Sequence, residues 1–278
     1  MQFGISTHLY HDQKLDRSHL AQVAGYGFES IELFATRSHF NYRDPAAVSA
    51  LGEWLETTGL GLLSVHAPIT DRFAVGDTWE PAYSIAAGDA FRRQAAVDEA
   101  AAALAVAKQI PFKLLVVHVG TPDPRAAPND NQRAAAVRSV EDICRVAEPL
   151  GVQVALEVIP NALSTPSALV ALVERDLEPA PGICLDFGHA FLGGDIPDAI
   201  ETVAEHLIAT HVHDNHRRND EHLAPYLGTI DWDAALMSMQ KIGFEGTYLM
   251  ELANTGSPAE VLDAARRARQ QFEKAMTY

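Results

Sequence analysis

Acidic and imidazole side chains recur at the ends of short apolar segments along most of this sequence. The segments read LLSVHAP, LLVVHVG, VALEVIP, ICLDFGHA, ATHVHDN and YLMELAN, and the candidate residues at their ends are His66, His118, Glu157, Asp186, His189, His211, His213, Asp214 and Glu251. Carboxylates that crowd into one place repel one another unless a cation neutralises them. Oxygen and imidazole ligands without thiolates suit Mn²⁺, Mg²⁺, Co²⁺ or Zn²⁺. The residue types therefore predict a divalent-metal site, provided that the fold brings the segment ends together.

The elements that carry these residues alternate regularly along the chain. Apolar or β-rich runs predict strands at Phe3–Ser6, Ser30–Phe34, Leu60–His66, Lys113–Val119, Val152–Val158, Gly182–Phe187, Ile208–His213 and Thr247–Leu252. Helical patterns lie between them, roughly at Leu15–Tyr26, Pro45–Thr58, Ala87–Lys108, Asn131–Leu150, Pro166–Arg175, Ile196–His206, Trp232–Ile242 and Pro258–Met276. Eight such units predict a parallel sheet with helical crossovers, and eight strands close a barrel. We therefore expect a single (β/α)8 TIM barrel, with residues 1–278 forming one domain.

Active sites of such barrels lie at the C-terminal ends of the strands, which is where the candidate residues fall. A lone His or carboxylate at a strand end is more simply explained by a structural hydrogen bond. Convergence from six consecutive strands favours a metal site instead. An open doubly wound sheet is the alternative fold, and it usually carries a glycine-rich turn after its first strand. The turn here, THLYHDQ, has no GxGxxG pattern, so dinucleotide binding is not expected.

The composition narrows the class of protein. The 278 residues are 47% hydrophobic, with no apolar run near the roughly 20 residues of a membrane span and no N-terminal secretion signal. Two cysteines, Cys144 and Cys184, allow neither a disulfide framework nor a cysteine zinc knuckle. The formal net charge of -16 disfavours binding to nucleic acid or to an anionic membrane. We therefore expect a cytoplasmic enzyme with a small-molecule substrate, and the sequence is compatible with a homo-oligomer.

Several motifs resemble those of the xylose isomerase-like barrel superfamily. They are SVHAP, VVHVG, LEV, CLDFGHAFLGGD, HVHDN, DEHLAPYLGTIDW and MEL. The similarity is greatest to the sugar phosphate isomerase/epimerase branch, which shares its domain with endonuclease IV. It extends from about Phe3 to Glu251, and its most specific parts are D-x-x-H-A and H-x-H-D followed by D-E-H-L. The resemblance implies metal-dependent chemistry on a small sugar, sugar phosphate or related polyol carbonyl compound.

In the ketose 3-epimerases of this superfamily, Glu, Asp, His and Glu from four consecutive strands bind one metal. The residues that match are Glu157, Asp186, His211 and Glu251, and His211 is preferred to His213 because the acidic Asp214 follows it three places later. The resemblance implies that Glu157 and Glu251 are also the catalytic pair. It further implies substrate contacts from His189 and Arg217. We expect His66, and Trp79 in the long loop that follows it, to contact the substrate as well.

The endonuclease IV pattern is longer than that of the epimerases. It adds His66, His118, His189, Asp220 and His222, so counterparts of all nine ligands of a trinuclear zinc site occur here. One metal is the main expectation, with up to three if these additional residues also bind metal. One departure concerns the segment after DEHL, where related sequences often read GEG and this chain has Tyr226-Leu227-Gly228. The pattern therefore leaves the conformation of that loop open.

Three functions follow from these residues. The leading hypothesis is isomerisation or epimerisation through a metal-stabilised enediolate, in a pocket that aromatic loop residues cover. The second is an endonuclease IV-like phosphodiesterase at abasic DNA sites. The matched ligands and the basic, aromatic segment FATRSHFNYR favour it, whereas the net charge disfavours it. The third is a non-catalytic metal-binding barrel, which a fold alone does not exclude. Glu32, at the end of the second strand, is predicted either to reach the pocket or to form a structural hydrogen bond.

Overall fold

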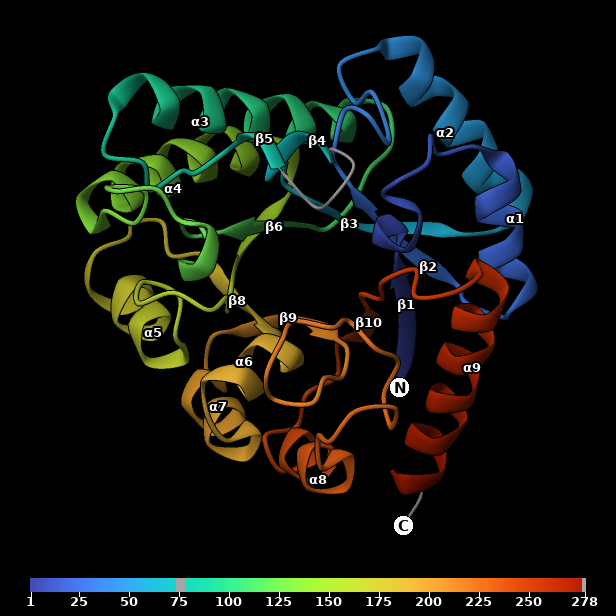
Figure 1. Cartoon of the computed structure of the whole chain (residues 1–278). Helices are drawn as coiled ribbons and strands as arrows, with labels where there is room; N and C mark the ends of the chain where they lie inside the picture. Colours follow the sequence, from blue (N-terminus) through green and yellow to red (C-terminus); the bar gives the residue numbers. More distant parts are fainter. Residues whose placement is uncertain (74–78, 277–278) are drawn as a thin grey trace.

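A closed barrel of eight parallel strands forms the centre of the molecule (Figure 1). The computed structural model describes residues 1–73 and 79–276. The strands are β1 (Gln2–Ser6), β2 (Ser30–Phe34), β3 (Gly61–His66), β6 (Leu114–His118), β7 (Gln153–Glu157), β8 (Gly182–Asp186), β9 (Leu207–Val212) and β10 (Thr247–Met250). Each pairs with its neighbours in chain order around the ring, and β10 closes the barrel on β1. The prediction of a single (β/α)8 barrel is confirmed.

Helices surround the barrel on its outer side (Figure 1). The longer ones are α1 (Arg17–Gly25), α2 (Pro45–Thr58), α3 (Ala90–Leu104), α4 (Arg133–Ala147), α5 (Pro166–Arg175), α7 (Ile196–Val203), α8 (Trp232–Lys241) and α9 (Pro258–Ala275). Single turns of 3-10 helix occur at Thr7–Tyr10, Ala105–Lys108, Asp123–Arg125 and Glu148–Leu150. Three of these helices begin with proline directly after a capping side chain, which Asp44, Thr165 and Ser257 provide.

The strand register brings the candidate residues to one level of the barrel. His118 pairs with Glu157 across β6 and β7, and Asp186 pairs with His211 across β8 and β9. Side chains alternate across a strand, so the residue two places earlier points the same way, into the barrel. These earlier residues form a small buried cluster of their own, made of Val116, Ala155, Cys184 and Ala209. Small apolar side chains thus support the polar residues from below.

One α-helix and one β-hairpin outside the predicted ranges also occur. Helix α6 (Phe187–Gly193) follows β8 directly, and strands β4 (Thr70–Phe73) and β5 (Trp79–Ala82) form a hairpin in the long loop after β3. The glycines of α6 lower its helix propensity, so the sequence pattern does not predict this helix. The helix forms because the Asp186 carboxylate accepts a hydrogen bond from the His189 amide at 2.7 Å. Among the described residues, no helix has both the length and the apolar character needed to cross a membrane.

Helix α6 packs on the buried side chain of His213 through Gly188, which gives a test of the packing. A Cβ atom on Gly188 would lie 1.9 Å from Cε1 of His213, whereas one on Gly193 of the same helix meets nothing within 4 Å. We predict that Gly188→Ala destabilises the protein by about 1–3 kcal/mol through overpacking. Gly193→Ala should leave the midpoint of thermal unfolding unchanged or raise it slightly, because alanine favours helix. Equal midpoints for the two variants would contradict this packing.

Candidate metal centre

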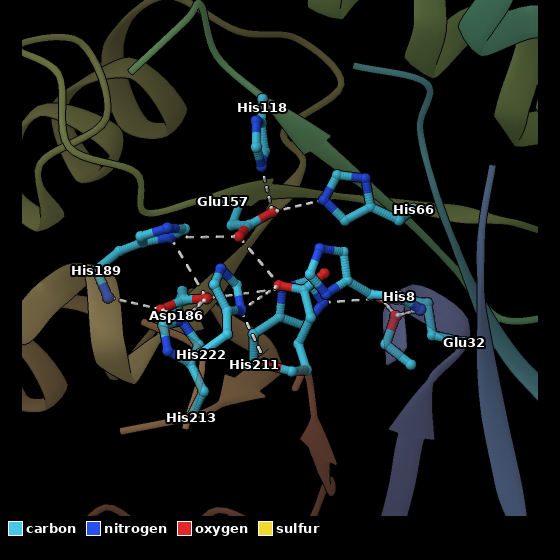
Figure 2. A network of polar contacts seen from close by, with 12 residues as sticks. His8, Glu32, His66, His118, Glu157, Asp186, His189, His211, His213 and His222 are labelled. Atoms are coloured by element: carbon cyan, nitrogen blue, oxygen red, sulfur yellow. Dashed lines mark hydrogen bonds and ion pairs between the residues drawn. The ribbon is translucent and has the colours of Figure 1, made fainter. Parts of the chain in front are cut away.

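Four of the predicted residues converge at the mouth of the barrel and form a central cluster, namely Glu157, Asp186, His211 and Glu251. Figure 2 labels the first three of them. All four side chains are buried. The Nδ1 atom of His211 lies 3.2 Å from Oε1 of Glu157, 3.5 Å from Oε2 of Glu251 and 3.9 Å from Oδ2 of Asp186. Two ligand atoms at about 2.1 Å from a tetrahedral metal ion are separated by roughly 3.4 Å. The spacing of the cluster therefore fits a divalent cation.

A second cluster lies beside the first and shares Glu157 with it. The Nε2 atoms of His66 and His118 each lie 3.1 Å from Oε2 of Glu157. The other oxygen of the same carboxylate, Oε1, faces His211 in the central cluster. Figure 2 shows Glu157 between the two histidines on one side and the central cluster on the other. This arrangement allows one carboxylate to bridge two cations.

The third cluster combines His189, His213, Asp220 and His222. Oδ2 of Asp220 lies 3.0 Å from Nε2 of His189 and 3.2 Å from Nε2 of His222. The sequence favours His211 over His213 as the central ligand. The structure nevertheless places Nε2 of His213 2.9 Å from Oδ1 of Asp186, so His213 contacts the central cluster as well. The structure thus brings all nine residues of the longer ligand pattern together, in three adjoining groups.

Asp214 holds the loop that brings Asp220 and His222 to this position. Its carboxylate accepts hydrogen bonds from the amides of Tyr226 and Ile230 and from the indole of Trp232. The backbone of Asp214 also pairs with that of Leu223. A Cβ atom at position 228 would lie 2.2 Å from the Asp214 carboxylate, so glycine is required there. The Tyr226-Leu227-Gly228 departure is therefore accommodated by a loop wrapped around one buried acid.

The acids of the three clusters form ion pairs with imidazole side chains, and all of them except Asp220 are buried. Among the described residues, Glu157, Asp186, Asp220 and Glu251 form ion pairs with histidines and with no lysine or arginine. Burial raises the pKa of Glu157, but His118 and His211 outweigh this effect and hold the pKa well below its usual range. A divalent cation would supply positive charge that no lysine or arginine of the described residues brings to these acids. The donor set therefore fits a metal by chemistry as well as by spacing.

A cavity of about 490 Å³ opens above the clusters. Phe34, Leu192 and Glu251 contribute to its wall, together with His66, His118, His189, Asp220 and His222 of the clusters. His8, which the sequence did not single out, also lines it and donates from Nδ1 to the carbonyl oxygen of Leu252 at 3.2 Å. A histidine in the turn THLYHDQ directly after the first strand was the available signal. The volume suits a small ligand such as a monosaccharide.

The predicted substrate contacts lie at different places. Arg217 lines the cavity, where its guanidinium donates to the carbonyl of Gly194 at 2.8 Å and lies over the Phe191 ring. Trp79 belongs to the β4–β5 hairpin, and its side chain lies outside the described part of the structure. The basic residues of FATRSHFNYR are engaged elsewhere, since Arg37 pairs with Asp71 and Arg43 with the Glu99 carboxylate on α3. That segment therefore offers its arginines less readily to a polyanion.

Comparison with known proteins identifies the family. The model of the xylose isomerase-like TIM barrel family matches residues 20–274, so the chain belongs to this family. A protein of Methanocaldococcus jannaschii, named only as uncharacterized, is 26% identical over 267 residues, which cover 91% of this chain and 84% of that protein. The resemblance read from the motifs is confirmed at the level of the family.

Solved structures share the fold over the full length of the chain. A D-tagatose 3-epimerase-like protein superimposes with a TM-score of 0.81 at 23% identity, covering 100% of this chain and 97% of that one. The D-psicose 3-epimerase of Clostridium cellulolyticum H10, solved with D-tagatose, gives 0.77 at 19% identity, with 99% of each chain covered. The IolI protein, solved with a bound zinc atom, gives 0.76 at 16% identity, with 98% of each chain covered.

The electrostatics of the clusters predict that metal binding releases protons. Burial lowers the pKa of His66 and His222, but Glu157 and Asp220 respectively outweigh it, and both pKa values reach about 9. Both histidines therefore carry protons at pH 7 in the metal-free protein, and each must lose one to bind a cation. If His66 and His222 act as ligands, the affinity for the metal should rise by about tenfold per unit of increasing pH for each proton released. It should level off above pH 9.

Isothermal titration with Zn²⁺ or Mn²⁺ at pH 7 and pH 9 measures the metal affinity. Repeating it in two buffers that differ in ionisation enthalpy measures the number of protons released. A His206→Gln variant is the control, because His206 pairs with Glu174 away from the clusters. Affinity that does not change with pH, together with heats that do not depend on the buffer, would rule out this linkage.

Proposed function

We propose that this protein is a metal-dependent isomerase or epimerase of a small sugar, sugar phosphate or related polyol carbonyl compound. The observation that carries the proposal is the pair Glu157 and Glu251, two carboxylates of one central cluster beneath a cavity of monosaccharide size. The sugar 3-epimerases among the structures with this fold support the same reaction class. We place the enzyme in the cytoplasm and treat residues 1–278 as one domain.

The cofactor in this proposal is a divalent cation bound by Glu157, Asp186, His211 and Glu251. Mn²⁺, Zn²⁺, Co²⁺ and Mg²⁺ all match these oxygen and imidazole donors. When bound, the cation supplies Lewis-acid stabilisation of the negative charge that develops on the substrate oxygens. One ion at the central cluster is sufficient for this role, and the two adjoining clusters raise the capacity to three.

The chain's own residues move the proton and hold the substrate. Glu251 lines the cavity, so it is placed to remove a proton from a substrate carbon. In this scheme Glu157, of the same cluster, returns a proton to the other face of that carbon. His66 and His189 border the same cavity and contact substrate hydroxyl groups in this scheme. Arg217 is already held by Gly194 and Phe191, so little side-chain freedom is lost when it binds a substrate oxygen or phosphate.

Phosphodiester cleavage at abasic DNA sites is the second candidate, and the three adjoining clusters are the observation that favours it. The net charge of -16 and the pairing of Arg37 and Arg43 with acids oppose it, because binding to DNA depends on unpaired basic groups. A non-catalytic metal-binding barrel is the third candidate. It explains Glu157 and Glu251 as metal ligands but gives no role to the cavity above them.

The three candidates separate in one set of assays on the metal-loaded protein. We predict conversion of at least one member of a panel of ketoses and ketose phosphates, detected by chromatography of the products. We predict no nicking of an oligonucleotide duplex that contains an abasic site. Nicking without sugar conversion would establish the phosphodiesterase, and metal binding without either activity would favour the non-catalytic barrel.

Substitution of Glu251 tests the proton-transfer pair. We predict that Glu251→Gln retains much of the metal affinity but abolishes turnover, because an amide oxygen still coordinates a cation but accepts no proton at neutral pH. The wild-type enzyme should incorporate solvent deuterium into the substrate carbon. Glu99→Gln is the control, since Glu99 is a buried acid held by Tyr42 and Arg43, and it should keep full activity. A fully active Glu251→Gln variant would remove Glu251 from the chemistry, and deuterium-free product would indicate a hydride shift.

A further inference from the structure

Glu32 is a buried acid that the proposed reaction does not use. It lies on β2, its side chain is 0% exposed, and it does not line the cavity above the clusters. Its oxygens accept hydrogen bonds from the hydroxyls of Ser6 at 3.2 Å and Ser64 at 2.9 Å, and from Nε2 of His211 at 3.1 Å. Both serines are neutral, so His211 is its one ion-pair partner among the described residues. Burial of a carboxylate is costly, and hydroxyl groups alone do not offset that cost.

The contact with Glu32 determines which nitrogen of His211 faces the central cluster. An ionised carboxylate only accepts hydrogen bonds, so Nε2 of His211 must carry the hydrogen that it donates to Glu32. In the neutral imidazole the lone pair then lies on Nδ1. This is the atom that lies 3.2 Å from Glu157 and 3.5 Å from Glu251. Glu32 and the cluster thus lie on opposite edges of one imidazole ring, as Figure 2 shows.

We propose that Glu32 is a positioning residue for the central metal site, which it serves through His211 without touching metal or substrate. Its carboxylate fixes the ring orientation and the tautomer of His211, and its charge makes Nδ1 a stronger electron donor. The proposal rests on the proposed metal centre and adds to it a residue of β2, a strand that contributes no ligand. The pairing of β2 with β3 aligns Glu32 with Ser64, so the same strand register supplies the acid and its hydroxyl partner.

Co²⁺ binding to the full-length protein tests this role without any substrate. Glu32→Gln keeps the shape of the side chain and an oxygen for His211, but it removes the charge. We expect the dissociation constant of Co²⁺ at the central site to rise about 10–100-fold and the visible absorption bands of bound Co²⁺ to shift. The thermal midpoint of the metal-free protein should change little, because Glu157, Asp186 and Glu251 still face His211 after the charge of Glu32 is removed.

Glu99→Gln is the matched control, since it also replaces a buried glutamate, but one held by Tyr42 and Arg43. It should lower the stability of the metal-free protein and leave Co²⁺ binding unchanged. If Glu32→Gln does not fold, Glu32→Asp replaces it, because the shorter side chain keeps the charge but withdraws it from His211. The same loss of Co²⁺ affinity is expected.

Two results would overturn the proposal while leaving the metal centre intact. One is a native Co²⁺ affinity and spectrum in the Glu32 variant. The other is a loss of affinity that only accompanies an equal loss of stability in the metal-free protein, which would assign Glu32 a purely structural role. A wild-type protein that binds no Co²⁺, Zn²⁺ or Mn²⁺ would instead refute the metal centre itself, and with it the role of Glu32.

Discussion

Several carboxylates are buried at one end of the barrel, and no lysine or arginine of the described part of the chain pairs with them; the site depends on this constraint. Glu32, Glu157, Asp186 and Glu251 are all buried, and their ion-pair partners among the described residues are histidines. The histidines come from several strands and from the segments that follow them, so they reach the acids from different sides. The arrangement of the upper half of the barrel follows from this need for compensating charge.

The parallel strands of the barrel, its regular part, supply much of this compensating charge. Neighbouring strands are in register, so an acid at the end of one lies level with a histidine at the end of the next, as with Asp186 and His211. Small side chains beneath the acids fill the barrel interior without pushing the polar layer upward. The segment after β9 is the irregular part, and the buried carboxylate of Asp214 organises it by hydrogen bonds to Tyr226, Ile230 and Trp232.

The regular parts were predictable from sequence, and the irregular ones were not. Alternating apolar runs and helices located every barrel strand to within one or two residues, because hydrophobic periodicity reports burial directly. Residues at strand ends, such as Glu157 and His211, were identifiable because barrel topology alone brings them together. Helix α6 was missed because its start depends on the Asp186 side chain, a local contact that periodicity does not record. Sequence likewise could not decide between a pocket role and a structural role for Glu32.

The shared carboxylate of Glu157 has a consequence for how the three clusters fill. Its two oxygens face different clusters, so a cation at the central cluster would reduce the negative charge that the neighbouring cluster presents. Ions bound there would therefore compete electrostatically and enter in order of decreasing affinity. The number of ions held would then depend on the free metal concentration. In such a centre, one unchanging set of side chains would hold a number of ions that the metal supply sets.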